Sequence, residues 1–271
     1  IPSETNILLR AFNEISLESG FYTADFSAIK EPRRLFMDNH HYTFISKAKD
    51  TETLIWKKEN TALFPDLWMS DQTFSKTERL SNANPQQHDF IWSTSELVEW
   101  NSISGEQLRG ILYKPENFNP SKKYPMVIYF YERMSETIHR YVTPAPSRST
   151  INRTMYPSNG YLVFVPDITY RDGFPGQSAF DAIVSGAMHL ISTASYVDRE
   201  KIGIQGQSWG GYQVAYLITR TNMFAAAMAG APVSNMTSAY GGVRWETGLS
   251  RMFQYEKTQS RIGGTLWEKP M

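Results

Sequence analysis

One serine of this chain has the sequence surroundings of a catalytic nucleophile. Residues 202–212 read Ile-Gly-Ile-Gln-Gly-Gln-Ser-Trp-Gly-Gly-Tyr, which places Ser208 at the centre of a Gly-x-Ser-x-Gly pattern. A serine hydroxyl becomes an effective nucleophile when a base takes its proton and fixed donors meet the developing oxyanion. The flanking glycines allow a sharp strand-to-helix turn, which directs the backbone N–H of Trp209 at the oxyanion. We therefore predict that Ser208 is the nucleophile and that the Trp209 N–H is one oxyanion donor.

The base that should accompany this serine is absent from the sequence that follows it. Enzymes of the α/β-hydrolase fold carry their triad in the order Ser, then Asp or Glu, then His, whereas residues 209–271 contain neither Asp nor His. We therefore expect the triad Asp and His to lie beyond residue 271, so that the chain by itself has an incomplete triad and is inactive. The later carboxylates are Glu246, Glu256 and Glu268, and the histidines, all upstream, are His40, His41, His88, His139 and His189.

The composition is that of an ordinary globular protein and excludes several function classes. The 271 residues carry 27 basic and 27 acidic side chains, so no global charge favours nucleic acid or an anionic membrane as a partner. No apolar run approaches the roughly 18–20 residues of a membrane helix. The absence of cysteine excludes disulfides, a thiol nucleophile and thiolate metal sites. Compartment and oligomeric state stay open, a homo-oligomer included.

The first ninety residues contain an internal repeat. The segment Phe21-Tyr-Thr-Ala-Asp-Phe-Ser, followed by Arg34-Leu35, resembles Leu67-Trp-Met-Ser-Asp-Gln-Thr, followed by Arg79-Leu80, at an offset of 45 to 46 residues. This period suits a four-stranded propeller blade. We predict that residues 1–90 are about two blades at the end of a β-propeller; two similar hairpins of a sandwich are the alternative.

After a linker rich in Asn, Pro and Gln at residues 82–87, the pattern changes to alternating strands and helices. Apolar, strand-sized runs at 124–131, 160–166, 201–206 and 224–230 are joined by helical patterns at 179–193 and 210–220, with residues 198–201 as a loop. Such alternation indicates a parallel sheet with helices on its faces. We predict that residues 91–271 are the N-terminal part of an α/β-hydrolase domain that lacks its C-terminal end.

Two segments, residues 197–212 and the Phe-Ala-Ala-Ala-Met-Ala-Gly-Ala-Pro-Val-Ser of 224–234, resemble the prolyl oligopeptidase family of serine peptidases, in particular its dipeptidyl-peptidase-IV and acylaminoacyl-peptidase branches. The resemblance implies a β-propeller followed by an α/β-hydrolase domain, the order found here from the residues. It also implies peptide substrates, hydrolysis through an acyl-enzyme at Ser208, and no cofactor.

The resemblance also implies further site residues. The family's second oxyanion donor is a tyrosine hydroxyl after a strand with a Lys-Lys-Tyr-Pro entry, and Lys122-Lys-Tyr-Pro-Met-Val-Ile-Tyr-Phe-Tyr places Tyr131 there. Glu-Arg-Met follows Tyr131 where the family commonly has small residues and proline. In the segment after Ala-Pro-Val-Ser, Val233 and Tyr240 are the expected substrate-binding residues. Met236 and Ala239 stand where proline-specific relatives carry aromatics, which argues against a preference for proline.

Other chemistries find little support. His40 and His41 beside Asp38 do not predict a metal site, because adjacent strand residues point to opposite faces. The glycines around Ser208 lack the Lys-Ser/Thr of a phosphate loop. Two alternatives to a peptidase stay open, namely an esterase or acyl-transfer enzyme on the same fold and a binding or scaffold protein that keeps a dead hydrolase fold.

Overall fold

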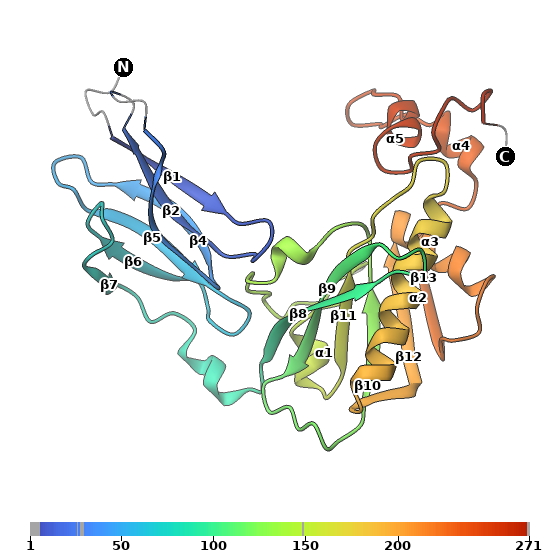
Figure 1. The fold of residues 1–271 in the computed structure, drawn as a ribbon, viewed down its shortest axis with the longest axis horizontal. Helices are drawn as coiled ribbons and strands as arrows, with labels where there is room; N and C mark the ends of the chain where they lie inside the picture. Colours follow the sequence, from blue (N-terminus) through green and yellow to red (C-terminus); the bar gives the residue numbers. More distant parts are fainter. Residues whose placement is uncertain (1–5, 26, 28–29, 148, 270–271) are drawn as a thin grey trace. The chain divides into compact units, whose positions relative to one another are not determined.

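The computed structural model describes residues 6–25, 27, 30–147 and 149–269, and the chain divides into two compact units (Figure 1). The N-terminal unit runs up to Ser95 and includes Glu136–Thr143. The C-terminal unit consists of Glu96–Ser135 and the chain from Pro144 onward. The return of 136–143 to the first unit was not anticipated from the sequence. The assignment of residues 1–90 to a propeller and of 91–271 to a peptidase domain stays a prediction.

The N-terminal unit contains two antiparallel sheets, with strand orders β1-β2-β3 and β4-β5-β6-β7. A short 3-10 helix, η1, follows the second sheet. The elements are β1 (Asn6–Phe12), β2 (Ser19–Asp25), β3 (Arg33–Asp38), β4 (His41–Lys47), β5 (Leu54–Glu59), β6 (Asp66–Ser70), β7 (Thr77–Arg79) and η1 (Pro85–Asp89).

The two copies of the sequence repeat occupy equivalent strands. The first copy forms β2 and β3, the second forms β6 and β7, and each pair is antiparallel. In each copy an aspartate accepts hydrogen bonds in the turn after the first strand. Asp25 Oδ1 accepts from the N–H and hydroxyl of Ser27, and Asp71 Oδ1 accepts from the N–H and hydroxyl of Thr73. The repeat is therefore a structural unit of two strands and a polar turn.

Aromatic rings make up most of the core of the N-terminal unit. Phe21 stacks on Phe74 with ring centroids 4.9 Å apart, and Trp56 stacks on Trp68 at 5.7 Å. Tyr42 lies between these groups and is 1% exposed. β-Branched and aromatic residues suit such half-buried pleated surfaces, so each sheet is stabilised mainly by ring packing.

The C-terminal unit is built on one mixed six-stranded sheet with the strand order β13-β12-β10-β11-β9-β8. β10 pairs in parallel with β11 and β12, β12 pairs in parallel with β13, and β9 is antiparallel to β11. The strands are β8 (Ser93–Asn101), β9 (Gln107–Pro115), β10 (Tyr124–Tyr129), β11 (Leu162–Pro166), β12 (Val197–Gln207) and β13 (Ala226–Gly230), and the helices are α1 (Met155–Ser158), α2 (Pro175–Thr193), α3 (Trp209–Ile218), α4 (Met236–Tyr240) and α5 (Met252–Glu256). The 3-10 helix η2 (Ser135–Thr137) begins at the last residue of this unit before the chain returns to the N-terminal unit.

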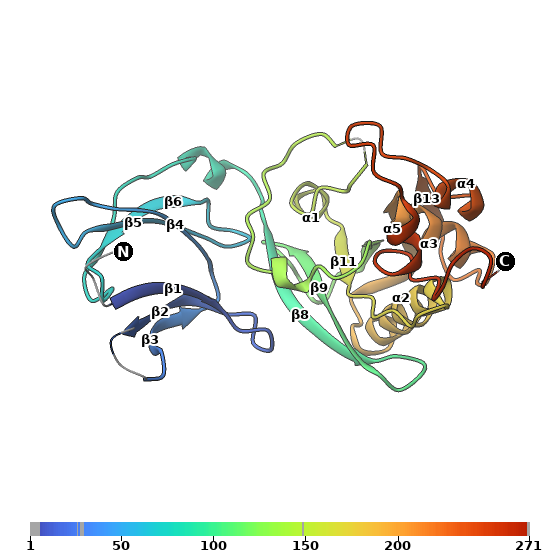
Figure 2. The ribbon, with the colours of Figure 1, turned by 90° about the horizontal axis from the view of Figure 1, so that it is seen from above.

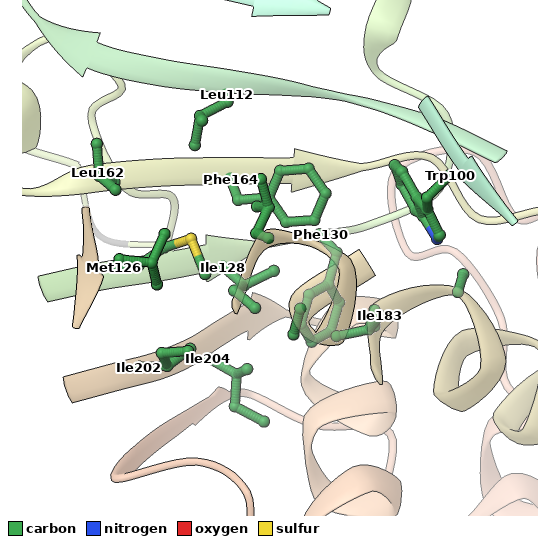
Figure 3. Close-up of a cluster of buried hydrophobic side chains, with 14 of the residues drawn as sticks. Trp100, Leu112, Met126, Ile128, Phe130, Leu162, Phe164, Ile183, Ile202 and Ile204 are labelled. Atoms are coloured by element: carbon green, nitrogen blue, oxygen red, sulfur yellow. The ribbon is translucent and has the colours of Figure 1, made fainter. Parts of the chain in front are cut away.

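The core of this unit follows from the two periodicities of strand and helix. Alternate residues of the three central strands lie on one face, namely Met126 and Ile128, Leu162 and Phe164, and Ile202 and Ile204. Figure 3 shows these side chains gathered with Ile183 of α2. All seven are 2% exposed or less, so the sheet is buried beneath the helix.

Helices α2 and α3 pack side by side against the sheet (Figure 2). Helix α2 begins at Pro175, four residues before the predicted start, because proline is favoured in the first helical turn. The loop predicted at 198–201 was wrong, since those residues form the first part of β12. There, Lys201 and Asp198 form an ion pair of 3.2 Å at the exposed start of the strand, which accounts for the polar sequence.

Candidate active site

Ser208 occupies a strained turn between β12 and α3. Its backbone has φ 58° and ψ −109°, a region that residues with a side chain rarely adopt. The conformation costs of order 1–3 kcal/mol, so the surrounding structure must impose it. The expected sharp strand-to-helix turn is therefore present, with Ser208 directly before the first residue of the helix.

Glycines impose that turn, because no side chain fits at three positions around Ser208. A Cβ at Gly206 would lie 2.8 Å from the Cα of Gly210 and closer still to its carbonyl. A Cβ at Gly210 would lie 2.6 Å from the carbonyl oxygen of Phe130, and one at Gly211 would lie 2.5 Å from that of Gly230. The sequence pattern thus encodes close approach of α3 to the ends of three strands, β10, β12 and β13.

The backbone around Ser208 is tied to the neighbouring strand. Ser208 N donates to the carbonyl of Gly230 at 2.8 Å, which ties the turn to the end of β13. The N–H of Trp209 is the first of α3, and the first four N–H groups of a helix have no acceptor within it. That N–H therefore suits an oxyanion, and the partial positive charge of the helix N-terminus adds to its effect.

The Trp209 indole lies in the core of a small cap formed by the chain after β13. It is fully buried, its Nε1 donates to the Tyr170 hydroxyl at 3.1 Å, and it stacks on Tyr212 at 4.6 Å. Its buried neighbours are Met236, Tyr240 and Tyr255. Helices α4 and α5 lie at the end of the sheet where β12 runs into α3 (Figure 1), so the cap sits over the turn.

Tyr131 lies beside this turn, two residues beyond the end of β10. A Cβ at Gly210 would be 3.7 Å from Cδ2 of its ring, which places the ring against the first turn of α3. Its hydroxyl accepts from Nε2 of Gln259. Its backbone carbonyl accepts from the Tyr170 hydroxyl at 3.1 Å and from Gln213 Nε2 at 3.2 Å. The structure thus brings Ser208, Trp209 and Tyr131 together.

The two predicted substrate-binding residues belong to the cap. Val233 is half-buried and packs against the cluster around Trp209. Tyr240 is 3% exposed, its hydroxyl donates to Glu256, and its ring meets Trp267 edge-on at 6.1 Å. Hydrogen bonding to the Glu256 carboxylate raises the pKa of Tyr240. A substrate role for both residues stays a prediction.

The loop that departs from the family's pattern, Glu132-Arg-Met, is anchored by Asp167. This buried carboxylate follows β11 and accepts from Met134 N at 2.6 Å and from Ser135 N at 2.9 Å. Arg261 pairs with Glu132 from the opposite side. A polar cavity of about 520 Å³ opens beside the loop and is lined by residues that include Arg109, Glu132, Arg133, Asp167, Tyr170 and Arg261.

Sequence reasoning missed four residues that contact Tyr131 or its neighbour Glu132. They are Tyr170, Gln213, Gln259 and Arg261. Only Tyr170 carried a signal, because it follows the buried strand β11, and ligands of α/β sheets bind outside the carboxyl ends of strands. The other three look like surface polar residues of a helix and a loop.

Residues 153–259 match the model of the prolyl oligopeptidase family. This part of the chain is therefore similar to members of that family. The chain is 31% identical to dipeptidyl peptidase 8 of Mus musculus over 184 residues, which make up 64% of this chain and 20% of that relative. It therefore spans about a fifth of the length of this relative.

Solved structures show the same fold. A putative dipeptidyl aminopeptidase IV from Bacteroides ovatus superimposes with a TM-score of 0.68 at 20% identity, over 98% of this chain and 37% of that one. The acylaminoacyl peptidase of Pyrococcus horikoshii superimposes with a TM-score of 0.67 at 18% identity, over 95% of this chain and 40% of that one. The antiparallel sheets and the mixed sheet with its helices thus share the fold of these two structures.

The described part of the chain also bears on metal binding and membrane insertion. Within it, no three His, Asp or Glu side chains gather in a way that could hold a metal ion. None of its helices has the length and apolar character needed to span a bilayer. Nor does any side chain in the described ranges hydrogen-bond the Ser208 hydroxyl.

Proposed function

We propose that the protein to which this chain belongs is a serine peptidase that cleaves peptide bonds through an acyl-enzyme at Ser208. The observation that carries the proposal is the φ of 58° at Ser208, held between glycines that admit no side chain. A strained residue at a strand-to-helix turn needs a reason, and presenting a hydroxyl above the end of the sheet supplies one.

The oxyanion that forms on the attacked carbonyl would meet two neutral donors. One is the N–H of Trp209, at the N-terminus of α3, and the other is the hydroxyl of Tyr131, whose ring lies against the same turn. Gln259 donates to that hydroxyl, which leaves its single proton available for the substrate. Fixed donors of this kind stabilise charge that develops only in the transition state.

In the proposed reaction a histidine takes the Ser208 proton as the serine oxygen bonds to the peptide carbonyl carbon. The same histidine returns the proton to the leaving amine as the peptide C–N bond breaks, and water then hydrolyses the ester. The order of triad residues on this fold leads us to propose that this histidine and its orienting aspartate lie beyond residue 271.

Peptide substrates are proposed because the matched relatives are named as peptidases. Val233 and Tyr240 would shape the pocket for the residue before the scissile bond. Since Tyr240 is buried under Trp267, it would act by supporting the wall of this pocket, while the half-buried Val233 would face the substrate.

Labelling with a fluorophosphonate tests the nucleophile in the full-length protein. We expect one adduct, located on Ser208 by mass spectrometry, and no adduct in Ser208→Ala. Ser192→Ala is the matched control, because this exposed serine at the end of α2 bonds only the carbonyl of His189. Labelling that persists unchanged in Ser208→Ala would sink the assignment.

A further inference from the structure

The backbone carbonyl of Tyr131 has two side-chain donors, which come from distant parts of the sequence. Strand β10 ends at Tyr129, so Tyr131 lies beyond the parallel ladder that orders the strand. Tyr170, from the loop after β11, donates to this carbonyl at 3.1 Å, and Gln213, from the second turn of α3, donates at 3.2 Å. Side chains therefore replace the sheet in holding the backbone of Tyr131.

The direction of each hydrogen bond follows from counting donors. The Tyr170 hydroxyl accepts from Trp209 Nε1, which can only donate, and from Gln213 Nε2. Its one proton is then directed at the Tyr131 carbonyl. The Gln213 amide is oriented by the same carbonyl, because the reversed amide would bring two acceptor oxygens together. The network has one consistent arrangement.

Burial makes the arrangement stiff. Gln213 is 0% exposed and is held through its Nε2, because its Oε1 is buried without a hydrogen-bond partner among the described residues. Loss of the Nε2 contacts would leave further polar groups buried and unpaired, at a large desolvation penalty. Burial also raises the pKa of Tyr170, so this phenol stays a neutral donor at physiological pH. The Arg261 guanidinium lies 4.8 Å from the centroid of the Tyr170 ring.

We propose that Tyr170 and Gln213 are positioning residues, which fix the Tyr131 phenol for the oxyanion by holding the backbone carbonyl of the same residue. This inference rests on the proposed function, because it needs Tyr131 as an oxyanion donor. The phenol is then held at two points, the carbonyl by Tyr170 and Gln213 and the hydroxyl by Gln259. The Trp209 indole also donates to the Tyr170 hydroxyl, whereas the backbone N–H of Trp209 is fixed separately as the first N–H of α3.

The test compares kcat and KM for a peptide substrate in single and double variants of the full-length protein. Loss of one oxyanion donor lowers kcat by about 10²–10³-fold in known cases, so Tyr131→Phe should fall by about 10². Displacing a donor without removing it costs less, and for Tyr170→Phe we expect about 10-fold in kcat with KM unchanged. The double variant should be no slower than Tyr131→Phe, because Tyr170 acts only through Tyr131.

Tyr216→Phe is the matched control, since this tyrosine of α3 donates to Gln177 and does not contact Tyr131. It should keep full kcat. If Tyr170→Phe does not fold, as judged by its thermal transition, Gln213→Met removes the other donor and makes the same comparison.

The outcomes separate the two proposals. Full activity of Tyr131→Phe would refute its oxyanion role, and with it the proposed oxyanion hole. A slow Tyr131→Phe combined with an unchanged Tyr170→Phe, or with losses that multiply in the double variant, would overturn the positioning role alone.

Discussion

The two units of the chain are stabilised in different ways. In the N-terminal unit a few large rings, among them Phe21, Tyr42 and Trp56, bury most of the apolar area, and the polar turns repeat. In the C-terminal unit many aliphatic side chains form a continuous layer between sheet and helices. Repeated hairpins need only local contacts, whereas the mixed sheet brings the backbone of α3 into direct contact with the strand ends. The strained serine is found in the second kind of structure, where its surroundings can hold it.

The largest expected effect separates the two cores. Trp56→Ala removes a ring that stacks on Trp68 and donates to Ser70 Oγ at 3.0 Å. Such truncations cost about 3–5 kcal/mol. Hydrogen exchange should show lost protection in β4 to β6 and unchanged protection in β10 and β12. Trp56→Phe, which keeps an aromatic ring, should lose less protection in β4 to β6. Equal loss of protection in both units after Trp56→Ala would mean that the two units unfold together.

The second effect concerns backbone approach in the C-terminal unit. Gly206→Ala puts a methyl group against the backbone of Gly210, so we expect a loss of stability of about 1–3 kcal/mol. Misplacement of Ser208 should slow fluorophosphonate labelling by about 10². Gly203→Ala, on the same strand, is the control, because its Cβ would meet only Ala226, at 3.6 Å. If the two variants have equal stability and equal labelling rates, Gly206 is not required for the close approach of α3.

A third effect is a pH dependence expected of the N-terminal unit. Burial, followed by the charges of Arg140 and Arg10, lowers the pKa of His41 from 6.5 to about 4. Because the unfolded chain takes up this proton first, stability should be complete above about pH 6.5 and fall as the pH drops towards 4. His41→Gln should flatten this part of the urea-midpoint profile, whereas His88→Gln, on the exposed η1, should not. If the urea midpoint of His41→Gln still falls over this pH range, another titratable group causes the pH dependence.

The smallest effect compares the two copies of the repeat. Hydrogen bonds from Ser75 and Thr73 lower the pKa of Asp71 to about 2, and Ser27 lowers the pKa of Asp25. The stabilisation from Asp71 is present above about pH 3.8 and is lost as the pH falls towards 2. Carbon NMR titration of the carboxyl groups should show both pKa values below 3.8, and Ser75→Ala should raise only that of Asp71. If Ser75→Ala leaves the pKa of Asp71 unchanged, the hydrogen bonds of the turn do not cause its low value.

Much of the fold and the turn at Ser208 could be predicted from the sequence, for identifiable reasons. Strand and helix periodicities located β10, β11 and α2 to within a few residues, and the glycines around Ser208 indicated the turn because no other residue fits there. The contacts of Gln213 were not predictable. On α3 it reads as a solvent-facing polar residue, and it is buried only because the loops after β10 and β11 close over it.

The backbone of Ser208 has a consequence for how sequences of this kind can change. Strain of about 1–3 kcal/mol at a positive φ is released most easily by glycine, which adopts that region freely. A protein with glycine in place of Ser208 would lose the hydroxyl needed for catalysis, but its folded state would no longer carry part of that strain energy. Replacement of this serine by glycine would therefore increase the stability of the folded protein while removing its activity. A serine that persists at this position indicates selection for activity.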